Sequence, residues 1–131
     1  MKLTFAGDLA FATATLTYRG AMTDVPDVLI DTGAASTVIN ADYAAEVGIL
    51  LDRTDRLRML RGVGGREFVF VRRIDRLAIG DHGLDDFEIE VGEMDYGFEI
   101  GGILGMDFLR AASAIIDLGA LTIEFSPIAT A

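Results

Sequence analysis

Alternation of apolar and polar side chains runs through much of this chain and predicts short β-strands. Positions 11–18 alternate with a period of two between apolar residues and a set rich in threonine, and the pattern ends at a turn at 19–20. Residues 28–30 (Val-Leu-Ile) have no polar position, which is typical of an interior strand. Two prolines, fifteen glycines and the β-branched and aromatic positions fit a chain of strands and turns.

The central part of the chain predicts two hairpins. The first joins 57–60 to the alternating segment 67–74 across a glycine-rich tip at 62–65. The second joins 77–79 to 87–91 across a turn that also contains glycine. Both hairpins add antiparallel strands, so the expected fold class is mainly β.

Two short helices and a last pair of strands complete the predicted elements. Asn40 is a suitable N-cap for a helix over 41–47, and a second short helix is expected over 107–112. The final strands are expected at 114–117 and 121–125. The pattern contains no linker, low-complexity stretch or solenoid repeat.

Length and composition limit the kinds of site that this chain can build. Its 131 residues are the usual size of one domain, so we expect a single domain over 1–131, and area scaling predicts that about two-thirds of its surface is buried. The absence of cysteine excludes a disulfide framework, a zinc-cysteine site and a thiol nucleophile. The single histidine, His82, excludes paired-histidine metal motifs, and without a G-x-S-x-G motif it argues against a serine triad.

The formal net charge of −10 argues against nonspecific binding to nucleic acid. No apolar run reaches the 18 residues that a membrane helix needs, and the first 18 residues alternate instead of forming the apolar core of a secretory signal. We therefore expect a soluble, cytoplasmic protein without a membrane partner.

The acidic average conceals a basic window between Arg53 and Arg76. This window contains eight of the eleven basic residues and three acidic ones, so it carries a net charge of +5 and the remainder carries −15. One interpretation is that its arginines face solvent on exposed strands. The other is that the window meets an acidic peptide or an acidic neighbouring subunit.

Asp31 is the first candidate for chemistry because it directly follows the apolar run at 28–30. Thr32, Gly33 and Ala34 come next, and small residues there let a backbone or a ligand approach closely. The structural alternative is an Asx turn, in which the Asp31 carboxylate accepts a hydrogen bond from the amide two residues on. Both interpretations stay open on this motif alone.

Two glycine-containing segments are further candidates. Residues 100–109 lead from an apolar strand through a glycine into a helix, and their structural interpretation is a packed strand-to-helix connection. The tip at 62–65 does not fit a dinucleotide-binding loop, because Glu67 stands where the last glycine of G-x-G-x-x-G belongs and no helix follows. No G-K-[ST] motif is present, so phosphate binding is excluded.

Taken together, these three features resemble the retropepsin family, the single-domain aspartic proteases of retroviral type. The shared pattern is D-T-G-A at 31–34, a glycine-rich hairpin at 62–65 and I-L-G-x-D-x-L at 103–109, and the resemblance extends over about 11–125. It is greatest to the protease-like domain of eukaryotic DNA-damage-inducible shuttle proteins and to bacterial single-domain relatives, which share an apolar-Asp strand like that at 115–118. The resemblance implies a mainly β, closed acid-protease barrel with one or two short helices and one lobe per chain.

Two positions depart from the viral pattern. Ala35 stands where viral enzymes usually have an acid, and Met106 stands where they usually have an arginine. The acid–arginine brace beside the viral active site is therefore missing. We expect substrate contacts and a dimer geometry that differ from those of viral enzymes.

Peptide hydrolysis by carboxylates needs two of them, one to take a proton from water and one to polarise the scissile carbonyl. This chain has one D-T-G motif and is too short for two lobes, so a homodimer would supply the second Asp31 by two-fold symmetry. Two carboxyl groups about 3 Å apart cannot both ionise, so the pair would share a proton. The predicted function is an aspartic endopeptidase without metal or organic cofactor.

The resemblance also implies roles for neighbouring residues. The Thr32 hydroxyl would brace the two catalytic loops across the axis, and the Gly33 carbonyl would face the substrate. The glycine-rich tip would be a flap that closes over an extended peptide or protein substrate; it consists of Gly62, Val63, Gly64 and Gly65. Five residues are expected to line the substrate pockets, with core packing as the alternative for the isoleucines and the leucine: Ile30, Ala34, Val63, Ile103 and Leu104.

Other interpretations compete with this one. Asp117 could belong to an internal second catalytic loop, but Leu118 stands where that loop needs a hydroxyl residue, and Asp107 is expected to cap its helix. A non-catalytic dimeric module could read extended peptides, although binding alone does not require an intact D-T-G. A hydrolase of glycosidic bonds would also use paired carboxylates, but 8% aromatic residues and no tryptophan offer little surface for stacking on sugars.

Overall fold

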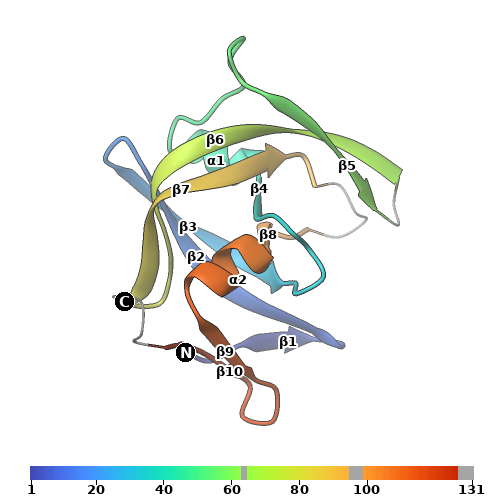
Figure 1. Cartoon of the computed structure of the whole chain (residues 1–131), viewed down its shortest axis with the longest axis vertical. Coiled ribbons are helices and arrows are strands. Elements are labelled where there is room, and N and C mark those ends of the chain that lie inside the picture. The colour runs from blue at the N-terminus through green and yellow to red at the C-terminus, as the bar shows by residue number, and fades with distance from the viewer. Residues whose placement is uncertain (63–64, 95–98, 127–131) are drawn as a thin grey trace.

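The computed structural model describes residues 1–62, 65–94 and 99–126 (Figure 1). The described residues form strands and two short helices in the following order: β1 (Thr4–Ala6), β2 (Leu9–Tyr18), β3 (Ala21–Ile30), β4 (Val38–Asn40), α1 (Ala41–Glu46), β5 (Leu57–Gly62), β6 (Gly65–Ile79), β7 (His82–Gly92), β8 (Gly102–Leu104), α2 (Met106–Ala111), β9 (Ala114–Asp117) and β10 (Thr122–Phe125).

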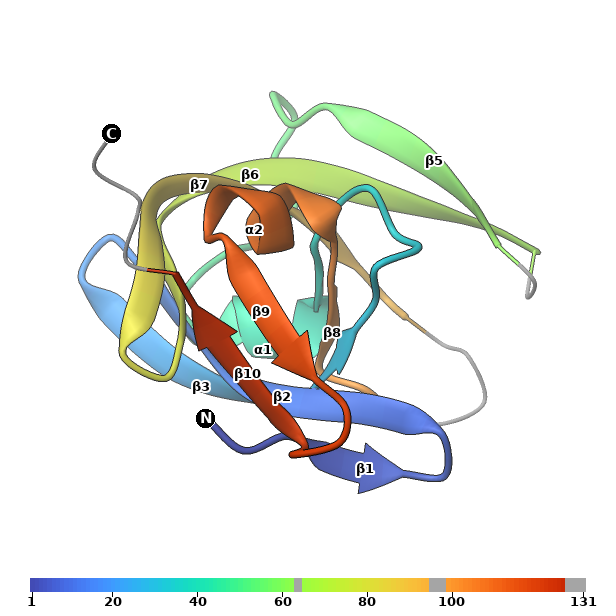
Figure 2. The same cartoon turned by 60° about the horizontal axis from the view of Figure 1, so that its bottom comes forward.

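Eight strands form one sheet in the order β1-β2-β3-β8-β4-β7-β6-β5, and β9 pairs with β10 in a second, two-stranded sheet. Because β2 also pairs with β6, the strands β2, β3, β8, β4, β7 and β6 make a closed ring of pairings. The β5–β6 hairpin extends away from this ring, and the β9–β10 hairpin lies beside the N-terminal segment (Figure 2). The predicted mainly β fold with two short helices is confirmed.

Both predicted hairpins are present, but they share one continuous strand. β6 covers residues 65–79, where the sequence pattern predicts separate strands at 67–74 and 77–79. The polar pair Asp75-Arg76 does not end the strand, because Asp75 is exposed and Arg76 forms an ion pair with Asp85 of β7 at 2.8 Å. β6 therefore runs without interruption from the β5–β6 hairpin into the ring.

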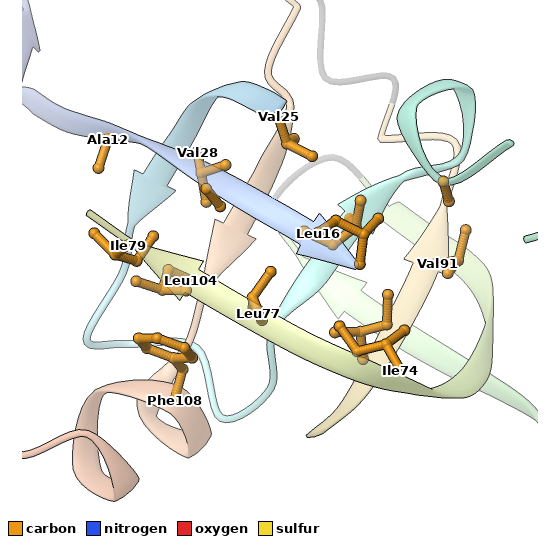
Figure 3. Packing of buried hydrophobic residues seen from close by; sticks show 14 of the residues in the cluster. Ala12, Leu16, Val25, Val28, Ile74, Leu77, Ile79, Val91, Leu104 and Phe108 are labelled. Atoms are coloured by element: carbon orange, nitrogen blue, oxygen red, sulfur yellow. The ribbon is translucent and has the colours of Figure 1, made fainter. Parts of the chain in front are cut away.

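The main hydrophobic core fills the space inside the ring. Alternate residues of β2 and β6 point inward, and Phe108 of α2 closes one end beside Leu104 and Ile79 (Figure 3). A smaller cluster lies on the other face of β3 and β8. Its members come from strands that are distant in sequence: Phe11, Leu29, Val38, Leu60, Val69, Met94, Ile100 and Ile103.

The path of the chain from β3 to β4 determines where Asp31 lies. β8 pairs with β3 on one side, in parallel, and with β4 on the other, antiparallel. The segment 31–37 therefore crosses the end of β8, and Figure 2 shows it beside β8 and the start of α2. A loop in this position has neighbours on two sides, which restricts its conformation.

The helices begin for different reasons. Asn40 caps α1, as predicted, because its side chain accepts a hydrogen bond from the Asp42 amide at 2.9 Å. Gly105 is the N-cap of α2 and has no side chain to contribute. Each helix has six residues, and within the described part of the chain none is long and apolar enough to cross a membrane.

Candidate active site

Asp31 directly follows β3, and the residue is half-buried. Its amide donates a hydrogen bond to the Leu104 carbonyl at 3.0 Å, which extends the β3–β8 pairing by one residue. Its Oδ1 accepts a hydrogen bond from the Gly33 amide at 2.9 Å, so the expected Asx turn is present. Among the described residues, Oδ2 has no hydrogen-bond partner within the chain, which leaves it for a ligand or a second subunit.

The loop after Asp31 is pressed against the start of α2. The amides of Met106 and Asp107 donate to the carbonyls of Ala34 and Ala35, at 2.8 and 3.2 Å. A Cβ atom at Gly105 would collide with the Ser36 carbonyl oxygen, so this contact requires glycine. The glycine of the I-L-G motif therefore allows the loop and the helix to approach closely.

A buried threonine and an aspartate brace this loop. Thr37 is fully buried, and its hydroxyl donates to Oδ1 of Asp107 at 2.7 Å while its amide donates to Oδ2 at 3.1 Å. The same hydroxyl accepts a hydrogen bond from the Gly105 amide at 3.1 Å. Asp107 is not the N-cap of α2, because Gly105 occupies that position. Its Oδ1 does accept a hydrogen bond from the Phe108 amide in the first turn at 2.7 Å, and the same carboxylate holds the loop that carries Asp31.

The remaining residues of the D-T-G-A motif lie at the surface of this single chain. Thr32 and Gly33 are exposed, and Ala34 is half-buried. Ala35 and Met106, which stand in place of the viral acid and arginine, line a hollow of about 560 Å³ together with Asp107, Arg110 and Ala111. The Thr37–Asp107 contact therefore stabilises the loop without the acid–arginine pair.

The predicted pocket residues divide between the two hydrophobic clusters. Ile103 is half-buried and belongs to the smaller cluster, as does Leu29. Because side chains alternate along a strand, Asp31 is expected on the same face of the sheet as Leu29. Ile30 packs against the main core instead. Leu104 has no exposed surface in the main core, so it offers nothing for a substrate to contact and the core-packing alternative holds for it.

The β5–β6 hairpin covers the smaller cluster. Its residues Leu60 and Val69 belong to this cluster together with Val38 and Ile103, which flank the crossing loop. Gly62 and Gly65 pair at the end of the hairpin, and the tip residues Val63 and Gly64 lie outside the described residues. The hairpin and the Asp31 loop thus border the same apolar cluster.

Arginines of the basic window pair with acidic residues of the next strand. Arg56, Arg58, Arg73 and Arg76 lie within 3.5 Å of carboxylates on β7, which come from Asp85, Asp86, Glu88 and Glu90. The side chains of Arg56 and Arg73 remain largely exposed. This agrees with the first interpretation of the basic window, in which its arginines face solvent. The acidic residues of the second hairpin therefore neutralise much of the window.

One arginine of the window has a structural role. Arg72 contacts the Asp55 carboxylate at 2.6 Å, the Tyr18 hydroxyl at 3.2 Å and the Leu50 carbonyl at 2.9 Å. The hydrogen bond from Arg72 lowers the pKa of Asp55 below its ordinary value. This contact attaches the segment before β5 to the ring.

Asp117 lies in the β9–β10 hairpin and accepts a hydrogen bond from the Ala120 amide at 2.9 Å. It therefore closes a turn between two strands, as the retropepsin resemblance implies for this segment. In the described ranges, no three histidine or acidic side chains lie close enough together to hold a metal ion.

Sequence reasoning found Asp31 and the I-L-G glycine but missed Thr37. The available signal was a hydroxyl residue directly before the apolar pair Val38-Ile39, because a polar side chain at the start of a buried strand needs a partner. That signal does not identify Asp107 as the partner, which follows only from the crossing of the loop over β8.

Comparison with known proteins agrees with this geometry. A family model described as aspartyl protease matches residues 14–108, a range that includes Asp31, Thr37 and Gly105. The fold is similar to the crystal structure of a retropepsin-like aspartic protease from Rickettsia conorii, with a TM-score of 0.65, 19% sequence identity and 92% of each chain covered. No curated protein matches the chain. The similarity to DNA-damage-inducible shuttle proteins stays a prediction, but the chain has the retropepsin-like fold and belongs to the aspartyl protease family.

Proposed function

We propose that this protein is an aspartic endopeptidase that works as a homodimer, with Asp31 and the partner subunit's Asp31 sharing one water molecule. The observation that carries the proposal is the single D-T-G loop, braced by Thr37 and Asp107, which presents a carboxylate with one oxygen that has no hydrogen-bond partner among the described residues. One carboxylate is insufficient for the reaction, and a two-fold axis beside Asp31 would supply the other.

The proposed chemistry follows from two carboxyl groups that share a proton. The ionised carboxylate takes a proton from the water, whose oxygen attacks the scissile carbonyl carbon, while the protonated carboxyl donates to the carbonyl oxygen. The tetrahedral intermediate collapses when the amide nitrogen receives a proton and the C–N bond breaks, which yields a carboxylic acid and an amine. The exposed Thr32 would brace the two loops across the axis.

The C-terminal hairpin is the proposed dimer contact. Among the described strands, β9 pairs only with β10, so its other edge has unpaired backbone groups. Ile115, Leu118 and Leu121 of this hairpin are exposed apolar side chains. A second copy that adds a strand at this edge would cover both the backbone groups and the apolar surface.

The substrate is proposed to bind in an extended form between the Asp31 loop and the β5–β6 hairpin, which acts as the flap. Ile103 and Ala34, with Val63 of the flap tip, remain the proposed pocket residues, and Ile30 would contribute only through its half-exposed surface. An apolar lining favours hydrophobic residues on both sides of the cleaved bond. A cytoplasmic location also stays a prediction.

Cleavage of a diverse peptide library tests the proposal. We expect the purified protein to cleave peptides between mildly acidic and neutral pH, and Asp31→Asn to lose at least about 1,000-fold in rate because the shared-proton pair is destroyed. Asp117→Asn is the matched control, since Asp117 is an exposed aspartate that only closes a turn. Mass spectrometry identifies the products.

Equal products from the wild type and Asp31→Asn would reject the protease proposal. Measurable peptide affinity without cleavage by either protein would instead identify the non-catalytic binding module. Sedimentation of the same samples at several concentrations tests the dimer, because a strictly monomeric but active protein contradicts the shared site.

A further inference from the structure

Glu90 is a buried glutamate in β7, between two residues that belong to the main core. Its neighbours Ile89 and Val91 point into the main core, and Glu90 points to the opposite face, towards the β5–β6 hairpin. The residue is 3% exposed. A charged group in such a position carries a large desolvation cost unless partners offset it.

The partners of Glu90 are incomplete. Its Oε2 accepts a hydrogen bond from Arg58 of β5 at 3.1 Å, but its Oε1 is buried and has no hydrogen-bond partner within the described residues. Arg58 also lies 3.5 Å from Glu88 and is 44% exposed at its side chain, so it can be solvated without Glu90. Uptake of a proton would remove the buried negative charge that Arg58 only partly compensates.

Glu90 connects two parts of the candidate site. Its amide donates a hydrogen bond to the Thr37 carbonyl at 2.9 Å, and Thr37 is held by Asp107 on its other side. Its side chain holds Arg58 in the first half of the β5–β6 hairpin. A continuous series of contacts therefore joins the Asp31 loop to the hairpin through this one residue.

We infer that Glu90 is a positioning residue that holds the β5–β6 hairpin over the Asp31 loop through Arg58, and that it releases Arg58 when it takes up a proton. The inference rests on the proposed function only where the hairpin acts as a flap. The release itself is a property of the fold and can be measured without a substrate.

The surroundings determine the pH range of this release. Burial is the main cause that raises the pKa of Glu90, the negative charges of Asp107 on α2 and Glu88 on β7 raise it further, and Arg58 on β5 opposes them. The facing residues Val38 of β4 and Val71 of β6 carry no charge. Glu90 therefore protonates at a higher pH than an ordinary glutamate, and the hairpin loosens as the medium becomes mildly acidic.

The same shift has a separate consequence for global stability. Because the folded-state pKa is raised above the unfolded value of 4.5, the ionised form of Glu90 disfavours the folded state, and stability decreases as the pH rises through the folded pKa. Glu90→Gln imitates the protonated form. We therefore expect this variant to unfold at the same temperature as the wild type or higher at neutral pH, although its hairpin is looser.

Amide hydrogen exchange, followed by NMR between about pH 4.5 and 7.5 and corrected for intrinsic rates, tests the inference. In the wild type we expect the protection of 57–60 and 67–71 to fall about tenfold as Glu90 protonates, because a charge-assisted hydrogen bond is lost. Glu90→Gln and Arg58→Met should show the low protection at every pH. Glu88→Gln is the matched control and should keep a transition, shifted to lower pH because the charge of Glu88 no longer raises the pKa of Glu90.

The pH profile of peptide cleavage provides the second readout. We expect Glu90→Gln to lose one acidic inflection in kcat/KM that Glu88→Gln retains. Constant hairpin protection in the wild type across this pH range, or an unchanged transition in Glu90→Gln, would overturn the inference. If no variant cleaves peptides, the protease proposal fails, but the exchange measurement still decides the role of Glu90.

Discussion

Thr37 is the residue on which the geometry of the Asp31 loop depends most. Its hydroxyl both donates to the half-buried Asp107 and accepts from the Gly105 amide, and the threonine and this glycine are buried. Thr37→Val keeps the shape but removes the hydroxyl, so a carboxylate oxygen loses one donor and a buried amide loses its acceptor. We expect a loss of about 2 kcal/mol in the free energy of unfolding.

Urea unfolding measures this loss, and steady-state kinetics measures its effect on the site. We expect kcat to fall more than KM rises, because the loop carries the reacting group rather than the substrate pockets. Thr37→Ser keeps the hydroxyl and serves as the control. A valine variant as stable and active as the wild type would show that the brace is dispensable.

For single residues, short-range patterns identified the candidate catalytic residue Asp31 but not the residues that support its loop. Asp31 was identifiable from the motif, and Gly105 from its place in I-L-G. The hydroxyl of Thr37 has no periodic signature, and its partner Asp107 was assigned to a helix cap because caps depend on local sequence only. Leu104 was predicted as a pocket residue but is fully buried in the core. An apolar strand residue beside a site can face either the substrate or the core, and the sequence does not distinguish the two.

Among the elements, the segment before β5 is held by an ion pair between Asp55 and Arg72 together with hydrogen bonds from Arg72 to the Leu50 carbonyl and from the Val71 amide to the Arg56 carbonyl. Asp55→Asn removes the charge that Arg72 binds, and we expect a loss of about 1–2 kcal/mol in the free energy of unfolding at neutral pH. Since the folded-state pKa of Asp55 is lowered, this stability is present above the unfolded value of 3.8 and is lost as the pH falls through the folded pKa.

Chemical unfolding of both proteins at a series of pH values checks this prediction. The wild type and Asp55→Asn should differ at neutral pH and converge in acid. Asp52→Asn is the control, because Asp52 accepts bonds only from its own turn and does not contact Arg72. A difference that stays constant into acid would assign the effect to packing and not to charge.

The position of a helix or strand was predictable where its hydrophobic periodicity ends at a clear capping or turn residue. The helix over 41–47 had a cap and a terminating glycine, and the structure places α1 at Ala41–Glu46. The first part of β3 was not predictable, because Pro26 and a positive φ of 52° at Asp27 interrupt its alternation while its pairing with β2 continues on both sides. Pairing with β2 keeps this segment in the sheet. The alternation of apolar and polar residues carries no information about that pairing.

At the scale of the whole molecule, strand pairing places distant segments around one loop. The pairing of β2 with β6 closes the ring, and β8 enters it between β3 and β4. No local pattern specifies these neighbours, so the architecture was predictable from the resemblance to retropepsins and not from periodicity. The single D-T-G motif, in contrast, is read directly from the sequence.

Two chains are proposed to share one site, and mixing of wild-type and variant subunits tests this sharing. Increasing amounts of Asp31→Asn are equilibrated with a fixed amount of wild type, and peptide cleavage is measured after sedimentation has shown that both proteins associate equally. If each site needs two Asp31 carboxylates, an equal amount of the variant lowers the cleavage rate to about half, and an excess lowers it towards zero. A rate that stays constant at every ratio would show that one chain carries a complete site, and would contradict the account.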